Sequence, residues 1–325
     1  MQYKGFGKTG WPVSEVGFGC WGLGGGWGPH DDQEAKSALK QALELGINFF
    51  DTAYIYGDGH SEKLLGEVLR GWQGPFVVAT KVPSKTMEWP ARPTTPIAQA
   101  FPASWIIQCT ETSLKRLGLE RVDLQQMHVW TDAWVDSDEW RQAADRLKRD
   151  GKIRAFGVSV NDHDPDSVVK LVAAGGIDSV QMIYNIFDQA PAQKLFPLCQ
   201  EHGVGVIVRV PFDEGSLTDS FTRQTRFPQG DWRAGYFKAD RLAQTCDRVE
   251  RLHAFLGPRI PTMSLLALKF ILSHPCVSTV IPGMRKVAHV QANCSASDGE
   301  RLSSEQLEQL KLHAWPRNFY TGAWD

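Results

Sequence analysis

Short apolar segments alternate along the chain with amphipathic or polar segments of helical length. The apolar segments are rich in β-branched residues, and several are almost continuously apolar, which is typical of parallel strands that are covered on both faces. We therefore predict strands at about residues 15–22, 47–53, 76–82, 122–129, 154–160, 179–184, 204–210 and 277–282.

The segments between these strands carry the signals of amphipathic helices. Residues 31–46 begin with acidic residues, end at Gly46 and place their alanines and leucines on one stripe. Residues 104–118 begin at Ser104, which is a suitable N-cap, and end at Gly118. Further helices are expected near residues 60–70, 137–150, 164–174, 191–202, 240–256, 261–274, 286–294 and 303–313.

This alternation predicts an α/β fold. Eight strands that are each followed by at least one helical segment indicate a (β/α)8 TIM barrel, which we expect residues 1–325 to form as a single domain. A doubly wound open sheet is the alternative. Residues 83–103 and 211–240 are too long for ordinary loops, and both follow the carboxyl ends of strands, where barrels form their binding pockets.

Composition and charge argue against several classes of protein, including nucleic-acid-binding, metal-binding, secreted and membrane-spanning proteins. The 35 basic and 37 acidic residues leave a formal net charge of −2, whereas a nucleic-acid-binding protein usually carries a basic surface. The six cysteines form no CxxC pair and the histidines show no ligand spacing, so we expect a cytoplasmic protein without a metal site. The chain begins without the apolar core of a signal peptide, and no apolar run is long enough to suggest a membrane span.

The segment Gly17–Gly22, GFGCWG, matches the GxGxxG pattern of dinucleotide-binding turns. That pattern requires its last glycine to open a helix directly. Here residues 23–29 contribute further glycines and a proline, which a helix does not tolerate. A strand end that continues into a glycine-rich loop is therefore favoured over a Rossmann turn.

Four titratable side chains fall at the ends of three consecutive predicted strands. Asp51 follows the apolar run INFF and Tyr56 lies just beyond it, while Lys81 and His128 end the next two strands. The carboxyl ends of parallel strands meet at one face of a barrel, so we expect these side chains to lie together. Each residue taken alone also has a structural interpretation. Asp51 and Lys81 could form a structural ion pair, and His128 could be a hydrogen-bonded histidine of the core. Four such residue types at equivalent strand ends favour a catalytic site.

These segments resemble the aldo-keto reductase superfamily over essentially the whole chain, and two further segments resemble a bacterial branch of it. The resemblance is carried in order by SEVGFGCWGLGG, DTAYIYGDGHSEKLLGEVL, VATKV, VDLQQMH, KIRAFGVSVND, VQMIYN and STVIPGMRK. It implies a (β/α)8 barrel preceded by an N-terminal β-hairpin, and NADPH-dependent reduction of an aldehyde or ketone.

The resemblance also implies a catalytic tetrad of Asp51, Tyr56, Lys81 and His128. Hydride attack turns a carbonyl oxygen into an alkoxide, which needs a proton donor and pre-aimed polar groups. Tyr56 would donate the proton and Lys81 would ease its ionisation in the reverse reaction. Asp51 would hold Lys81, and His128 would donate to the carbonyl oxygen.

By the same resemblance, Ser159, Asn161 and Gln181 would bind the nicotinamide carboxamide. Arg209 stands where many relatives have a tyrosine that stacks on the nicotinamide, and Pro211 follows it in the cofactor site. A planar guanidinium can stack on a ring, and its charge would favour NADPH over NADP+. The alternative is that Arg209 pairs with an acid such as Asp213 or with a cofactor phosphate.

The phosphate end of the cofactor is expected after the eighth strand. Gly283 and Arg285 precede a predicted helix, and a helix N-terminus with an arginine suits the 2′-phosphate of NADPH. His289 and Asn293 occupy family positions on that helix. Met284 and Ala292 replace polar family residues, which leaves the preference for NADP over NAD open.

Trp21 and Trp130 adjoin two of the strands that face the tetrad, so we expect them to line an aromatic substrate pocket. Neither the carbonyl substrate nor the oligomeric state follows from the sequence. Two other functions stay open. One is a nicotinamide-binding sensor or regulatory subunit of a membrane channel with slow turnover, and the other is a barrel lyase or isomerase.

Overall fold

A computed structural model describes residues 1–25 and 31–320. Within them, eight parallel strands lie in one sheet in the order of the sequence. These strands are β3 (Phe18–Gly19), β4 (Phe49–Asp51), β5 (Val77–Val82), β6 (Val122–Met127), β7 (Ile153–Ser159), β8 (Ser179–Ile183), β9 (Gly205–Arg209) and β10 (Thr279–Val280).

The sheet closes on itself where the first strand meets the last. Parallel bridges join Val16 to Val280 and Gly19 to Gly283, and the Val280 amide donates to the Glu15 carbonyl at 2.9 Å. A Cβ on Gly19 would lie 2.6 Å from the Ile281 carbonyl oxygen, so only glycine permits this approach. The predicted TIM barrel is therefore confirmed, and the open sheet is excluded.

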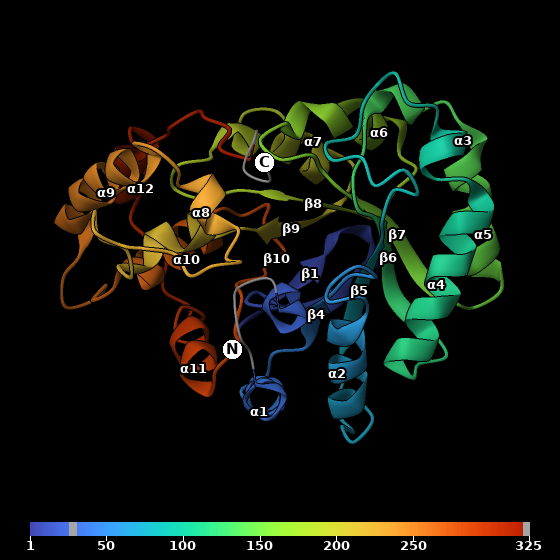
Figure 1. The fold of residues 1–325 in the computed structure, drawn as a ribbon, viewed down its shortest axis with the longest axis horizontal. Coiled ribbons are helices and arrows are strands. Elements are labelled where there is room, and N and C mark those ends of the chain that lie inside the picture. The colour runs from blue at the N-terminus through green and yellow to red at the C-terminus, as the bar shows by residue number, and fades with distance from the viewer. Residues whose placement is uncertain (26–30, 321–325) are drawn as a thin grey trace.

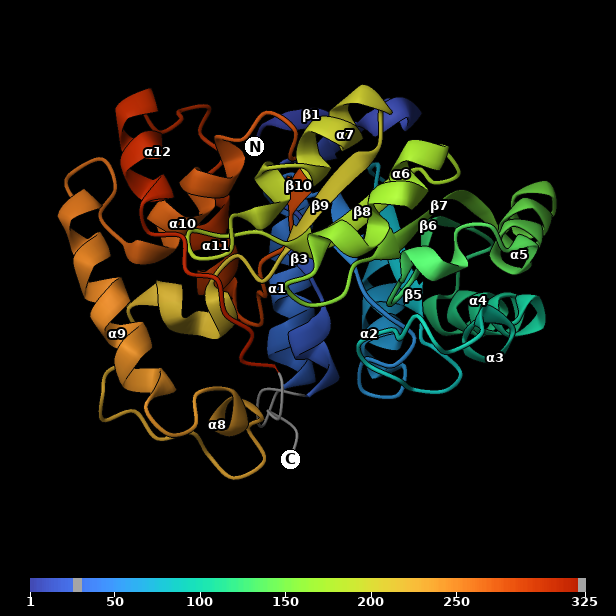
Figure 2. The same ribbon diagram turned by 90° about the horizontal axis from the view of Figure 1, so that it is seen from above.

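Helices surround the strands, as Figures 1 and 2 show. They are α1 (Asp32–Glu44), α2 (His60–Leu69), α3 (Ile97–Ala100), α4 (Ala103–Leu117), α5 (Asp138–Arg149), α6 (Val169–Ala174), α7 (Leu195–Glu201), α8 (Arg233–Tyr236), α9 (Arg241–Leu252), α10 (Met263–Leu272), α11 (Val287–Cys294) and α12 (Ser304–Lys311). No helix in the described part of the chain has the length and apolar character needed to span a membrane.

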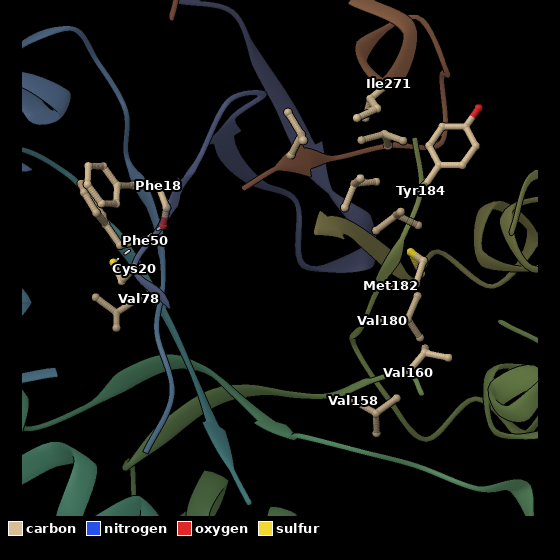
Figure 3. Close-up of a cluster of buried hydrophobic side chains, with 14 of the residues drawn as sticks. Phe18, Cys20, Phe50, Val78, Val158, Val160, Val180, Met182, Tyr184 and Ile271 are labelled. Atoms are coloured by element: carbon tan, nitrogen blue, oxygen red, sulfur yellow. Dashed lines mark hydrogen bonds between the residues drawn. The ribbon is translucent and has the colours of Figure 1, made fainter. Parts of the chain in front are cut away.

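Successive side chains of each strand point to opposite faces of the sheet and so form two layers. One set points outward to the helices, and Figure 3 shows part of it, including Phe50, Val78, Val180 and Met182. The other set points into the barrel.

An antiparallel hairpin of β1 (Tyr3–Phe6) and β2 (Trp11–Ser14) lies at the amino ends of the barrel strands, where Phe6 and Val13 pack with interior side chains from β4, β6 and β9. The predicted N-terminal hairpin is thus present.

Several local details differ from the sequence prediction. Helix α4 begins at Ala103 with Pro102 as its N-cap, so the prediction of Ser104 as N-cap is wrong. The physical reason is that the Glu139 carboxylate accepts from the Ala103 amide at 2.9 Å and satisfies the helix start from outside. The stretch 83–103 also contains α3, and 211–240 contains α8 and a 3₁₀ helix over Asp213–Thr218.

The GxGxxG segment ends within a 3₁₀ helix, Trp21–Gly24, and does not open an α-helix. A Cβ on Gly24 would lie 2.6 Å from the Gly57 amide nitrogen, so the chain segments after β3 and β4 pack backbone against backbone. The glycine-rich loop was predicted to continue to residue 29, but residues 26–30 lie outside the described part of the chain. The absence of a Rossmann helix start at Gly22 agrees with the sequence interpretation.

Candidate active site at the carboxyl ends of the strands

Polar side chains form a layer directly above an apolar one inside the barrel. Phe49, Ala79, Leu124 and Ile207 are buried apolar residues of β4, β5, β6 and β9. Two positions further along the same strands lie Asp51, Lys81, Gln126 and Arg209. Because side chains two apart on a strand share a face, the polar set points into the barrel at its carboxyl end. The sequence thus changes from apolar to polar where the site begins.

Lys81 and Asp51 form a buried ion pair at the centre of this layer. The Lys81 ammonium donates to Asp51 Oδ1 at 2.5 Å, to the Thr52 carbonyl at 2.8 Å and to the Tyr56 hydroxyl at 3.3 Å. Burial lowers the pKa of Lys81, but Asp51 and Tyr56 outweigh it, so the pKa lies above its ordinary value. The lysine is therefore charged, and its donors are committed.

The second carboxylate oxygen of Asp51 accepts two amide donors. Gln181 of β8 donates at 2.7 Å and Gln126 of β6 donates at 3.4 Å. A buried carboxylate is tolerated when its oxygens are paired and hydrogen-bonded in this way. Gln181 was predicted to contact a nicotinamide carboxamide, and the structure places its amide nitrogen against Asp51. Gln126 has the same role and was not predicted.

Tyr56 lies in the segment after β4 with its hydroxyl beside Lys81. Burial raises the pKa of the Tyr56 phenol, and Lys81 offsets only part of this effect. The net pKa is above the ordinary value, so the hydroxyl keeps its proton at neutral pH. The lysine therefore orients a protonated tyrosine rather than ionising it.

His128 follows β6 and faces Tyr56, with 5.7 Å between the ring centroids. Burial, together with Lys81 and Arg209, lowers the pKa of His128 well below its ordinary value. The imidazole is thus neutral. Its Nδ1 is buried and has no hydrogen-bond partner within residues 1–25 and 31–320, which is compatible with a proton on Nε2.

Three further polar atoms of this layer are buried without a partner in the described residues. They are Gln126 Oε1 in β6, Ser159 Oγ at the end of β7 and Arg209 Nε at the end of β9. Buried polar atoms are normally hydrogen-bonded, so several unpartnered atoms at the same end of the barrel indicate a place for a polar ligand. This fits the carboxamide of a nicotinamide cofactor, which Ser159 was predicted to bind.

Asn161 and Arg209 have protein partners. The Asn161 side chain accepts from the Ala91 amide at 3.1 Å and donates to the Ala91 carbonyl at 3.4 Å. Arg209 donates to Asp162 Oδ1 at 2.7 Å and to the Val160 carbonyl at 3.0 Å. Pairing of Arg209 with an acid was one of the two alternatives, but Asp213 as that acid is wrong. Asp213 instead binds Arg317, which arrives from the C-terminal segment.

Gly283 and Arg285, which were predicted for the phosphate end, lie beside the carboxyl end of β3. Gly283 bridges to Gly19, and the methylenes of half-buried Arg285 pack over Gly22, where a Cβ would lie 3.1 Å from Arg285 Cδ. Burial and the nearby Arg233 lower the pKa of Arg285. On α11, His289 is exposed and Asn293 is buried. Pro211 is buried just beyond β9.

The two predicted pocket tryptophans have different surroundings. Trp21 is partly exposed and packs edge-on against Trp232, with 6.1 Å between centroids. Trp130 is completely buried between Trp134 and Trp140 in the apolar core. Its prediction as a pocket residue is therefore wrong, because β6 ends at Met127 and the strand alternation no longer determines side-chain direction at residue 130.

Two sets of contacts were not predicted from the sequence, although Trp89 was one of the tryptophans considered for an aromatic pocket. Trp89, in the long segment after β5, lies against His128 with 5.0 Å between centroids. The chain after α12 lies near α8 (Figure 2) and is anchored by Arg317, which binds Asp188 and Asp213, and by Tyr320, whose hydroxyl donates to Glu214. Both depend on contacts between residues far apart in sequence, for which the sequence pattern gave no signal.

The chain is similar to known proteins over most of its length. The family model described as Aldo/keto reductase family matches residues 15–314. The chain is 31% identical to a putative voltage-gated potassium channel subunit beta of Schizosaccharomyces pombe, covering 95% of this chain and 92% of that protein. It is 28% identical to an NADH-specific methylglyoxal reductase of Escherichia coli, covering 94% and 98%. The solved holo form of aldo-keto reductase AKR11C1 from Bacillus halodurans is 30% identical, with 97% and 96% coverage and a TM-score of 0.76.

Proposed function

Because the chain belongs to the aldo/keto reductase family, we propose that it reduces an aldehyde or ketone to an alcohol with NADPH and with Tyr56 as proton donor. The observation that carries this proposal is the Asp51–Lys81–Tyr56 chain beside a neutral His128. A cytoplasmic location is consistent with the six unpaired cysteines.

The chemistry assigned to each residue follows from its protonation state. A bound nicotinamide cofactor supplies the hydride. The neutral His128 donates a hydrogen bond to the carbonyl oxygen and fixes its approach, and the protonated Tyr56 gives its proton to that oxygen as negative charge develops. The Lys81 ammonium, held by Asp51, stabilises the phenolate that remains until Tyr56 is reprotonated.

Ser159 and Arg209 are the residues we assign to the nicotinamide end, since both have buried polar atoms without partners in the described chain. Asn161 would have to exchange its contact with Ala91 to take part. Arg285 is assigned to the 2′-phosphate of NADPH, to which a guanidinium can donate charged hydrogen bonds. His289 and Asn293 of α11 and the residues Pro211 and Gly283 complete the proposed cofactor site.

Steady-state assays of the purified full chain test this function. We expect oxidation of NADPH that depends on added aldehyde or ketone, and a lower kcat/KM with NADH. The E. coli relative is named as NADH-specific, so the comparison of the two cofactors decides the assignment of NADPH. Equal use of both cofactors would refute the NADPH preference without refuting carbonyl reduction.

A regulatory role is the second candidate, since one relative is named as a potassium channel subunit beta. Both roles require cofactor binding, which quenching of protein fluorescence by NADPH measures. Tight binding without turnover on a broad aldehyde panel would favour the regulatory role. Turnover on several aldehydes would favour the enzyme.

A further inference from the structure

The segment that contains Tyr56 has little regular structure of its own. Residues 54–59 form turns between β4 and α2, and the Asp58 side chain among them is fully exposed. On the barrel side, the Tyr54 amide donates to the Lys81 carbonyl at 3.1 Å. Exposed turns open locally at a low cost in free energy. The position of the Tyr56 hydroxyl therefore depends on the contacts that hold this segment from outside the barrel.

Arg116, in the last turn of α4, supplies several of these contacts. Its Nη1 donates to the Tyr54 carbonyl at 2.8 Å and to Glu62 Oε2 at 3.3 Å. Its Nη2 lies 3.5 Å from Asp58 Oδ1, and its guanidinium packs over the Tyr54 ring at 4.3 Å from the centroid. Arg116 thus contacts the residue two positions before Tyr56 and the residue two positions after it.

A buried carboxylate anchors the arginine in turn. Glu62, in the first turn of α2, is completely buried, and its Oε1 accepts from the Thr80 hydroxyl at 2.7 Å. Thr80 directly precedes Lys81 in β5. Helices α2 and α4 pack against each other on the outside of the barrel (Figure 1). Arg116 and Glu62 therefore connect the segment that contains Tyr56 to the strand that contains Lys81.

The backbone of Gly59 allows the guanidinium to come this close. A Cβ at Gly59 would lie 2.3 Å from Arg116 Cζ, and the residue has a φ of +84°. Both the space and the left-handed conformation favour glycine here. Only 16% of the Arg116 side chain is exposed. The arginine is therefore enclosed by the segment that it contacts, unlike an ion pair on the surface, whose contribution is small.

We propose that Arg116 is a positioning residue for the catalytic step. It fixes the turns on both sides of Tyr56 and so holds the Tyr56 hydroxyl 3.3 Å from the Lys81 ammonium. This inference rests on the proposed function, because it needs Tyr56 to be the proton donor of a carbonyl reduction. A displacement of about 1 Å in an active site can lower a rate by on the order of 100-fold. Arg116 therefore acts on kcat through Tyr56 and not on the binding of substrate or cofactor.

The first test replaces Arg116 by methionine, which keeps an unbranched chain and removes every donor. Turnover is measured with the aldehyde that the parent reduces fastest. The enzyme concentration comes from fluorescence titration with the nicotinamide cofactor, so unfolded chains do not enter kcat. We expect Arg116→Met to lower kcat by about 10- to 100-fold. The KM for the aldehyde and the Kd of the cofactor should stay within about twofold of the parent values.

The matched control is Arg154→Met. Arg154, near the amino end of β7, also forms an ion pair with a carboxylate of low exposure, that of Asp123 at 2.8 Å, and packs over the Trp11 ring at 4.2 Å from the centroid. It lies at the end of the barrel opposite to Tyr56. Arg154→Met should lose stability in urea unfolding, as Arg116→Met does, but keep kcat within about twofold of the parent value.

A conservative variant keeps the test decisive. Arg116→Lys retains the charge but not the planar set of donors, so its kcat should fall between those of the parent and Arg116→Met. If Arg116→Met does not fold, Arg116→Lys decides the question, with an expected loss in kcat of about threefold or more.

The loss should disappear when no hydroxyl is left to position. In the Tyr56→Phe background, Arg116→Met should change the residual turnover by less than about twofold, since two residues that act through one contact are not additive. A purely structural role of Arg116 would instead lower the residual turnover by the same factor as in the parent.

A parent that reduces no aldehyde with either cofactor contradicts the proposed function, and the inference fails with it. A parent that turns over while Arg116→Met keeps its kcat within about twofold overturns the inference alone. So does an equal loss of kcat in Arg154→Met, or an undiminished loss in the Tyr56→Phe background.

Discussion

Lys81 combines complete burial with a full positive charge, and Asp51 is its only carboxylate partner among the described residues. Removal of one member of a buried ion pair costs about 3 to 5 kcal/mol, because the other charge stays buried without a counter-ion. We therefore expect Lys81→Met to lose about this much free energy of unfolding as well as its activity. Urea unfolding measures the stability change.

The double variant Lys81→Met with Asp51→Asn provides the control. It removes both charges, so part of the stability should return while activity does not. A Lys81→Met single variant with the stability of the parent would show that the pair contributes nothing to the folded state.

Glu214 is a buried acid whose titration we expect to affect stability. Burial raises the pKa of Glu214 to about 7 from an ordinary 4.5, although the Tyr320 hydroxyl partly opposes the shift. The folded chain thus binds this proton more tightly than the unfolded chain does. The stabilisation is complete below about pH 4.5 and is lost as the pH rises through about 7, and it amounts to on the order of 3 kcal/mol.

Glu214→Gln removes this titration. Relative to the parent, the variant should therefore gain stability progressively between about pH 4.5 and pH 7 and keep the gain above that. Urea unfolding of both proteins over this range gives the difference directly. A difference that does not change with pH would show that Glu214 is ionised throughout.

At the residue scale, the sequence predicted correctly that Asp51, Lys81, Tyr56 and His128 lie together, but it predicted the surroundings of other proposed site residues poorly. Asp51, Lys81 and His128 were predicted together because each lies at or just after the end of a regular strand, where alternation determines side-chain direction. Trp130 was assigned wrongly because it lies beyond that regularity. The Trp89 indole N–H donates to the carboxylate of Asp162, and these residues lie far apart in the sequence. No local sequence pattern therefore predicts their contact.

At the element scale, the C-terminal segment depends on Arg317. Its buried guanidinium binds Asp188 at 3.2 Å and also Asp213, and it packs over Trp315 at 4.5 Å from the ring centroid. Arg317→Met would keep much of the packing but leave two buried carboxylates without this partner. We expect a loss of about 3 to 5 kcal/mol and faster hydrogen exchange in residues 313–320.

The matched control is Arg226→Met, because Arg226 is exposed and donates hydrogen bonds to the backbone carbonyls of Gln224 and Thr225. It should change stability by less than about 0.5 kcal/mol. Equal effects of the two substitutions would mean that the ion pairs of Arg317 do not hold the segment.

Strands and most helices were predictable because they bury apolar stripes of regular period. Helix α1 was expected over residues 31–46 and spans Asp32–Glu44. The start of α4 was not predicted correctly, because its first amide, that of Ala103, donates to the Glu139 carboxylate of α5 and not to a neighbouring residue. The two long segments were expected in the right places, but their internal helices and anchors depend on tertiary contacts.

At the scale of the whole molecule, closure of the barrel brings β3 beside β10 and so places Arg285 over Gly22. If Arg285 binds the 2′-phosphate, its charged hydrogen bond contributes about 1.5 to 3 kcal/mol. Arg285→Ala should then weaken NADPH binding by roughly 10- to 150-fold and leave NADH almost unaffected. Fluorescence titration with both cofactors measures this. Equal losses would show that Arg285 contacts a group that the two cofactors share.

The central claim is that Tyr56 supplies the proton in a carbonyl reduction. Tyr56→Phe retains the ring and removes the hydroxyl that lies 3.3 Å from Lys81. The most direct test measures kcat for aldehyde reduction and the Kd of NADPH in this variant and the parent. We predict a loss in kcat of about 10²- to 10⁴-fold with nearly unchanged NADPH affinity. Turnover close to that of the parent would contradict the account.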